Sequence, residues 1–87
     1  MFKLNAVTLE VLKPSELQVM DLLKALEKAP NVARVEITLT DFERSTDTLK
    51  VTIEGQGLAM DKISRAISES GGVVQNVQHV LGERQAP

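Results

Sequence analysis

A chain of 87 residues without cysteine can form no disulfide framework, no thiolate metal site and no thiol redox centre. Ten Lys and Arg against twelve Asp and Glu, with Phe2 and Phe42 as the only aromatic residues, argue against binding to nucleic acid. Charges at Lys3, Glu10 and Lys13 and the lack of a run of ~20 apolar residues argue against a signal peptide and membrane insertion, so we expect a cytoplasmic protein.

The first part of the chain changes from strand-like alternation to a helical pattern. In "LNAVTLEVL" apolar residues occupy every second position, which predicts a half-buried strand that ends at Pro14. Ser15 then stands at a helix N-cap with Gln18 three residues later, the spacing of a capping box. The apolar stripe that follows predicts a helix from Glu16 to about Ala29.

Four more elements follow in the remaining chain. The alternating runs "VARVEITLTDF" and "LKVTIEG" flank the polar turn "ERSTD" and predict a β-hairpin. A weaker helical stripe from Met60 to Ile67 is closed by two glycines at 71–72, of the kind that ends helices. The run "VVQNVQHVL" predicts a last strand, but its apolar residues do not share one parity, so we expect a bulge.

The element order is therefore βαββαβ, and its two halves resemble each other. An offset of 41 residues pairs Leu22 with Ile63 and Leu26 with Ile67. Two βαβ halves with right-handed crossovers interleave into a ferredoxin-like α+β sandwich, a four-stranded antiparallel sheet with two helices on one face. We expect a single domain over residues 1–87, with 82–87 as a frayed tail.

The expected core combines the helix-facing positions of the strands with the apolar stripes of the helices. These positions are Val7, Leu9, Val11, Val19, Leu22, Leu26, Val35, Ile37, Leu39, Leu49, Val51, Ile53, Ile63 and Ile67. A domain of this size buries only about 60% of the surface of its unfolded chain, so it is marginally stable alone and self-association is expected to help. The second and fourth strands would form the open edges of the sheet.

Gly55 and Gly57 are candidate ligand-binding residues at the corner between the third strand and the second helix. A phosphate cradle needs glycines for close backbone approach and a helix N-terminus aimed at the anion. The sequence continues with Leu58-Ala59-Met60, so it has neither a third glycine nor a P-loop lysine. The favoured interpretation is a tight corner in which both glycines take positive φ.

Three segments resemble the small archaeal-type proteins known as domain of unknown function 211: "EVLKP", "LKVTIEG" and "SGGVV". The resemblance covers nearly the whole chain. It implies a ferredoxin-like fold, symmetric and often ring-like homo-oligomers, and no established enzymatic activity. The chain departs from that family's pattern at Ser15, where a His is common, and at Gln78 and His79, where an acidic pair is common. A cation site at those positions is therefore not carried over.

Asp41, Glu43 and Asp47 bracket the hairpin turn and are the candidate metal ligands. Oxygen ligands at such spacing suit a hard cation such as Ca²⁺, although the EF-hand pattern is absent. The alternative is a solvated acidic tip that Arg44 neutralises. His79 is the only histidine, and it is a candidate ligand-binding residue if a symmetric assembly repeats it; otherwise it is an ordinary surface residue.

No set of residues suggests catalysis, because the serines lack a nucleophile-elbow context and the carboxylates fall mostly on solvent faces. We therefore expect a non-catalytic homo-oligomer, a regulatory or ligand- and ion-binding module with sites between subunits and no cofactor beyond a divalent cation. The alternative is a structural or adaptor protein that binds a protein partner through its sheet face or an edge strand. An enzyme with a site shared between subunits is the third possibility, and it has few titrating groups to use.

Overall fold

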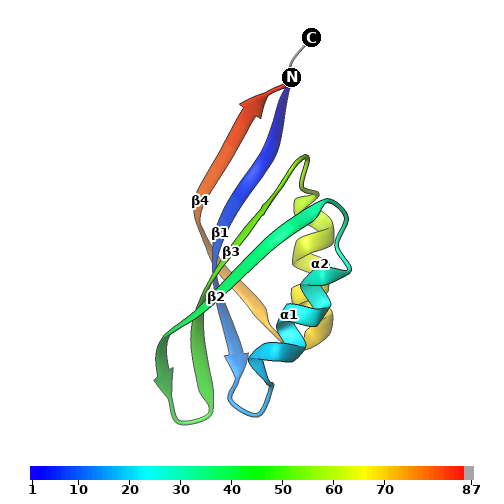
Figure 1. Cartoon of the computed structure of the whole chain (residues 1–87). Coiled ribbons are helices and arrows are strands. Elements are labelled where there is room, and N and C mark those ends of the chain that lie inside the picture. Colours follow the sequence, from blue (N-terminus) through cyan, green and yellow to red (C-terminus); the bar gives the residue numbers. More distant parts are fainter. Residues whose placement is uncertain (86–87) are drawn as a thin grey trace.

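Four strands and two helices follow one another in the predicted order. The computed structural model describes residues 1–85. Its elements are β1 (Phe2–Pro14), α1 (Val19–Glu27), β2 (Val32–Glu43), β3 (Thr46–Gly55), α2 (Met60–Ser70) and β4 (Val73–Arg84) (Figure 1). The sheet has the order β2-β3-β1-β4, and every neighbouring pair is antiparallel. This arrangement confirms the ferredoxin-like α+β fold.

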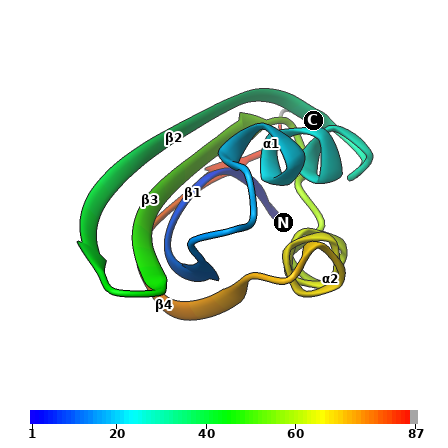
Figure 2. The ribbon, with the colours of Figure 1, turned by 90° about the horizontal axis from the view of Figure 1, so that it is seen from below.

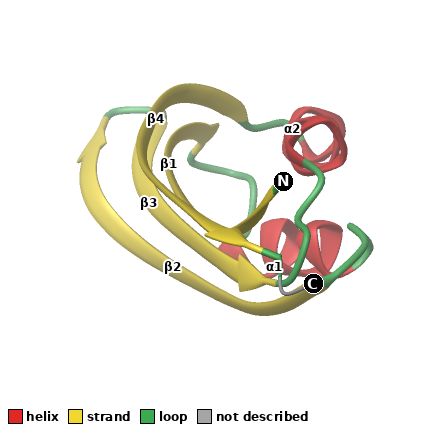
Figure 3. Ribbon diagram, turned by 90° about the horizontal axis from the view of Figure 1, so that it is seen from above, coloured by secondary structure: helices red, strands yellow, loops and turns green. Residues whose placement is uncertain are grey.

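The sheet is strongly curved, and both helices lie on its concave side (Figures 2 and 3). β1 and β3 are central, whereas β2 and β4 are the edges. The helices run in opposite directions along the sheet (Figure 1). No helix among the described residues has the length and apolar character that crossing a bilayer requires.

The core lies between the concave face of the central strands and the two helices. Ten side chains are completely buried: Val7, Leu9, Val11, Leu22, Leu26, Leu49, Val51, Ile53, Ile63 and Ile67. All ten belong to the predicted core, which confirms the strand parity and the helical stripes. Leu58 and Ala29 join this cluster from the corner before α2 and from the end of α1.

Four other predicted core residues are not fully buried. Val35 and Ile37 on the edge strand β2 are only partly covered, and the exposed fraction is 51% for Leu39 and 38% for Val19. Leu39 has the concave parity, because it pairs with the buried Leu49, but no helix lies over this part of the edge. The assignment of Leu39 and Val19 to the core was therefore wrong.

The start of α1 also differs from the prediction. The helix begins at Val19 rather than Glu16, and Gln18 is its N-cap without a side-chain hydrogen bond. The Ser15 hydroxyl instead donates to Asp47 Oδ1, 3.2 Å away in β3. The hydroxyl that a capping box would use is thus bonded to Asp47, a residue distant in the sequence. At the other helix, α2 ends as predicted at Gly71, which has φ 104°.

Two bulges resolve the mixed parity of β4. Gln75 and Gln78 are extra residues opposite β1, so three residues of β4 span two residues of β1 at each bulge. The concave positions of β4 are Val74, Val77 and Val80, opposite Val11, Leu9 and Val7 of β1. The expected bulge is confirmed.

β4 continues further than the predicted tail allows. It runs to Arg84, which pairs with Phe2, and the Arg84 guanidinium lies 4.7 Å from the centre of the Phe2 ring. The Gln85 N–H donates to the carbonyl of Met1. Residues 82–84 are therefore strand rather than frayed tail, and 86–87 lie outside the described residues.

Candidate functional site

The corner at residues 55–57 is closed by two asparagine side chains. Gly57 has φ 74°; its N–H donates to Asn5 Oδ1 at 3.1 Å, and its carbonyl accepts from Asn31 Nδ2 at 3.0 Å. Gly55 does not have positive φ, so that expectation holds for Gly57 alone. A Cβ at Gly55 would overlap the carbonyl oxygen of Asn31. This position therefore requires glycine because the backbone of Asn31 comes so close. Because the Gly57 amide is already bonded, the geometry favours a structural corner over a phosphate cradle.

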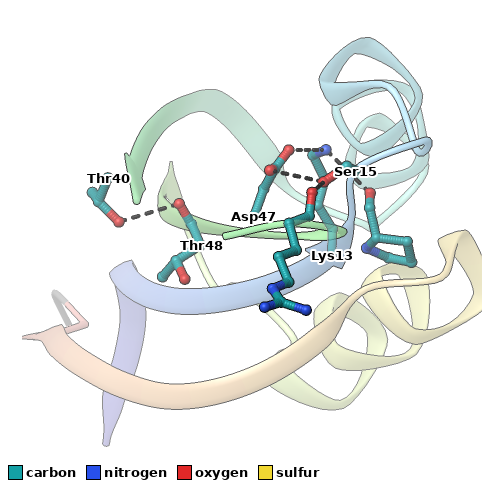
Figure 4. A network of polar contacts seen from close by, with 7 residues as sticks. Lys13, Ser15, Thr40, Asp47 and Thr48 are labelled. Atoms are coloured by element: carbon teal, nitrogen blue, oxygen red, sulfur yellow. Dashed lines mark hydrogen bonds and ion pairs between the residues drawn. The ribbon is translucent and has the colours of Figure 1, made fainter. Parts of the chain in front are cut away.

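Asp47 lies on the concave face and forms an ion pair with Lys13 of β1 (Figure 4). The distance from Lys13 Nζ to Asp47 Oδ2 is 2.7 Å, and the Lys13 side chain is only 3% exposed. This hydrogen bond holds the pKa of Asp47 below its ordinary value, and a second one from the Ser15 hydroxyl acts in the same direction. All three residues come from the end of the molecule where the β2–β3 hairpin turns.

The other two candidate metal ligands do not join Asp47. Asp41 pairs with Thr48, the chain neighbour of Asp47, and so faces the opposite side of the sheet. Its Oδ1 accepts the N–H of Phe42 at 2.9 Å. Glu43 is exposed at the turn. Within residues 1–85, no three His, Cys, Asp or Glu side chains lie close enough together to hold a metal ion.

His79 lies on the convex face of the sheet. It pairs with Thr8 of β1 and is exposed, whereas Thr8 is buried and its hydroxyl lies 3.3 Å from that of Thr52. Elsewhere this face carries exposed charges, with Arg34 3.8 Å from Glu54. The structure brings His79 next to neither the glycine corner nor the hairpin carboxylates, so the predicted site residues remain in three separate places.

Both sheet edges expose apolar surface that the pattern of the sequence did not indicate. On β4, Val77 and Val80 have the concave parity but are 49% and 59% exposed. On β2, Leu39 and Phe42 also face the concave side, and they are 51% and 71% exposed. The period-two rule could not find the β4 valines as one set, because the bulges space them three residues apart.

A hollow of about 490 Å³ lies beside β2, between that edge and α1. Its apolar lining consists of Met20, Leu23, Val32, Ala33 and Val35. Lys24, Glu27 and Arg34 form its polar part. One edge of the sheet thus carries protruding valines and the other a hollow of apolar character.

Two comparisons with known proteins agree with the resemblance in the sequence. A model of the DUF211 family, described as uncharacterized ArCR, matches residues 5–85. An uncharacterized protein of Methanocaldococcus jannaschii is 30% identical over 82 residues, which are 94% of this chain and 84% of the relative. The match extends from β1 to the end of β4 and so includes every element of the fold. The chain therefore belongs to the DUF211 family.

Proposed function

We propose that this protein is a non-catalytic module that assembles edge to edge with copies of itself and binds a small ligand or ion between subunits. The observation that carries the proposal is the complementarity of the two sheet edges. Val77 and Val80 protrude from β4, and the apolar hollow beside β2 would receive such side chains from a neighbour. Burying them would remove apolar surface from water, which drives association.

The strand directions allow this contact to form without turning either copy over. β2 and β4 run antiparallel to each other, since three antiparallel steps separate them in the sheet. A second copy in the same orientation would bring its β2 beside β4 of the first as an antiparallel pair. Both strands are 12 residues long and offer unpaired backbone groups on their outer sides.

An edge contact of this kind is head to tail, because each copy uses β4 on one side and β2 on the other. Such contacts close into rings when the rotation from one copy to the next allows it. The sheet is strongly curved (Figure 2), so each copy added at an edge would be rotated in the same direction relative to the copy before it. We therefore propose a closed ring rather than an open filament.

The non-catalytic character rests on the chemistry of the polar groups. The pKa of Asp47 is lowered, but its carboxylate is bonded to Lys13 and Ser15. These bonds are those of a structural ion pair. His79 lies apart on the convex face. A regulatory or ligand-binding role follows by analogy with other ferredoxin-like modules, and the joint between copies is where residues repeated by symmetry would meet.

Sedimentation at micromolar concentration tests the assembly. The native chain should sediment as a multiple of its 9.5 kDa mass. A Val77→Asp/Val80→Asp variant should sediment as the monomer, because two carboxylates would enter the apolar contact. The matched control is Val73→Asp/Leu81→Asp, which changes two exposed residues of the same strand with the convex parity and should keep the assembly.

A native chain near 9.5 kDa would overturn the proposal and leave the edges free for a different protein, as an adaptor would need. Native mass spectrometry of the assembly then tests the ligand. We expect a small molecule or ion to remain bound, and adding it to dialysed protein should raise the melting temperature. An assembly that retains nothing and shows no shift with divalent cations would contradict the binding part of the proposal.

A further inference from the structure

A groove of about 440 Å³ lies between α1 and α2 and opens to solvent. Ala25, Ala29 and Ala66 form its floor, and they are more buried than the charged residues along its walls. Small methyl side chains leave depth between the helices that larger residues would fill. The volume falls within the range of pockets that bind small molecules.

Positive charge is concentrated along this groove. Lys24 and Lys28 line it from α1 and the residue after it, and Lys62 and Arg65 line it from α2. They are four of the ten Lys and Arg in a chain whose formal net charge is −2. None of the four takes part in the ion pairs formed within residues 1–85.

The antiparallel helices sort the charges along the groove. Lys28 lies just after the end of α1 and Lys62 near the start of α2, so both are at the same end. Asp21 near the start of α1 and Glu69 near the end of α2 lie together at the opposite end. The groove therefore has a basic end and an acidic end.

The helix macrodipole explains only half of the basic cluster. Lys24 and Lys28 are at the C-terminal end of α1, where cations complement the helix macrodipole. Lys62 is in the first turn of α2, where the macrodipole disfavours cations, and Arg65 is at the middle of the helix, where the macrodipole has little effect. The macrodipole therefore does not account for the α2 pair, which lines the groove opposite the α1 lysines.

We infer that this groove binds a small polyanion, a molecule with two or more phosphoryl groups. The cations of the two helices contact it from opposite walls, and the alanine floor admits it. Asp21 and Glu69 limit its length, because a long polyanion such as nucleic acid would meet their carboxylates. The groove shares only Lys24 with the hollow beside β2, and its other lining residues lie outside the proposed joint between copies.

Calorimetric titration with inorganic pyrophosphate is the first test. The native protein should bind it, and Lys62→Gln/Arg65→Gln should weaken binding by at least about tenfold, since both changes remove charge-assisted hydrogen bonds. This variant avoids Lys24, which also borders the hollow beside β2. The control Lys3→Gln/Lys50→Gln removes the same charge elsewhere and should weaken binding less than about threefold.

No pyrophosphate binding by the native protein, or equal weakening in both variants, would overturn the inference. Amide chemical shifts of the native protein locate the site even if a variant fails to fold. Pyrophosphate should shift Ala25, Ala29 and Ala66, and shifts confined to other residues would contradict the site. Binding of a single-stranded oligonucleotide without binding of pyrophosphate would likewise contradict a small ligand. The Lys62→Gln/Arg65→Gln variant should sediment like the native chain, which separates this test from that of the assembly.

Discussion

Lys13 lies under the turn of the β2–β3 hairpin with its ammonium almost completely removed from water. Its Nζ donates to Asp47 Oδ2 at 2.7 Å and to the carbonyl of Pro14 at 3.3 Å. Asp47 also accepts from the Ser15 hydroxyl. These bonds join the end of β1, the start of β3 and the loop before α1, so three segments depend on one charged pair.

Acid should weaken this junction. Because the pKa of Asp47 is depressed in the folded protein, the ion pair contributes stability above the ordinary Asp value of 3.8, and this contribution disappears as the pH falls through the lower folded value. Asp47→Asn should therefore lower the free energy of unfolding at neutral pH but flatten its decline below about pH 4. Urea unfolding across that range measures both effects. Glu16→Gln, a change in the exposed loop, should keep the native pH dependence; a native slope in Asp47→Asn would contradict the prediction.

The two glycines of the corner should respond differently to alanine. Gly57→Ala should cost about 1–2 kcal/mol, the strain of an L residue at positive φ. Gly55→Ala should cost more, because the backbone of Asn31 would have to move away from the new methyl group. Urea unfolding of the two variants compares them directly. A smaller loss for Gly55→Ala would mean that the approach of Asn31 is not what requires glycine there.

At the scale of elements, periodicity predicted well which face of the sheet a residue occupies and poorly whether a helix buries it. Parity placed Leu49 and Leu39 on the same face of neighbouring strands, and both do face the helices' side. Leu49 is buried and Leu39 is half exposed, because parity says nothing of whether a helix lies above the residue. The bulges of β4 have the same origin: they depend on pairing with β1, a strand at the other end of the chain.

The candidate sites were less predictable because they depend on contacts between distant segments. The spacing of Ser15 and Gln18 is local, but the hydroxyl of Ser15 bonds to Asp47, 32 residues away. An extra residue at Thr40 shifts the pairing of β2 and places Asp41 on the face opposite to Asp47. At the corner, the absence of a third glycine and of a P-loop lysine was visible in the sequence. The approach of Asn31 to Gly55 and the bond from Gly57 to Asn5 come from distant segments and were not.

Two substitutions in α1 test how far burial follows from the helical stripe. Leu26→Ala should lower the free energy of unfolding by about 2–5 kcal/mol, because a fully buried side chain leaves a cavity. Val19→Ala should change it by less than about 1 kcal/mol, since Val19 is 38% exposed at the first turn. Chemical denaturation at one protein concentration gives both values. Equal losses would show that the two positions are equally packed.

The whole molecule is long and narrow, with extents of 50 × 22 × 17 Å. Its helices lie over the concave face (Figure 2), and exposed apolar residues remain along both edges, Leu39 and Phe42 on β2 and Val77 and Val80 on β4. The proposed assembly uses those edges, whereas the proposed polyanion site uses the outer groove between the helices. The two proposals therefore rely on different forces, apolar burial in one case and charge in the other.

Salt should separate these two interactions. At about 1 M sodium chloride the Debye length is about 3 Å, so pyrophosphate binding at the basic groove should be lost. The assembly should persist, because apolar burial and backbone hydrogen bonds are not screened. Sedimentation and calorimetry in the same buffers measure both properties. Dissociation of the assembly by salt would point to charged contacts between subunits instead of the edge valines.

The central position of β1 determines when the fold can be completed during synthesis. β1 leaves the ribosome before the other elements of this chain, yet its neighbours in the sheet are β3 and β4, and Phe2 pairs with Arg84 in the last strand. β1 has no partner in the sheet until β3 has been made, whereas β2 and β3 can pair as soon as their hairpin is complete. Closure over such sequence distances slows folding. The apolar side chains of β1 consequently stay exposed until β3 and the helices have been made, and in that interval the nascent chain is open to aggregation and to chaperones.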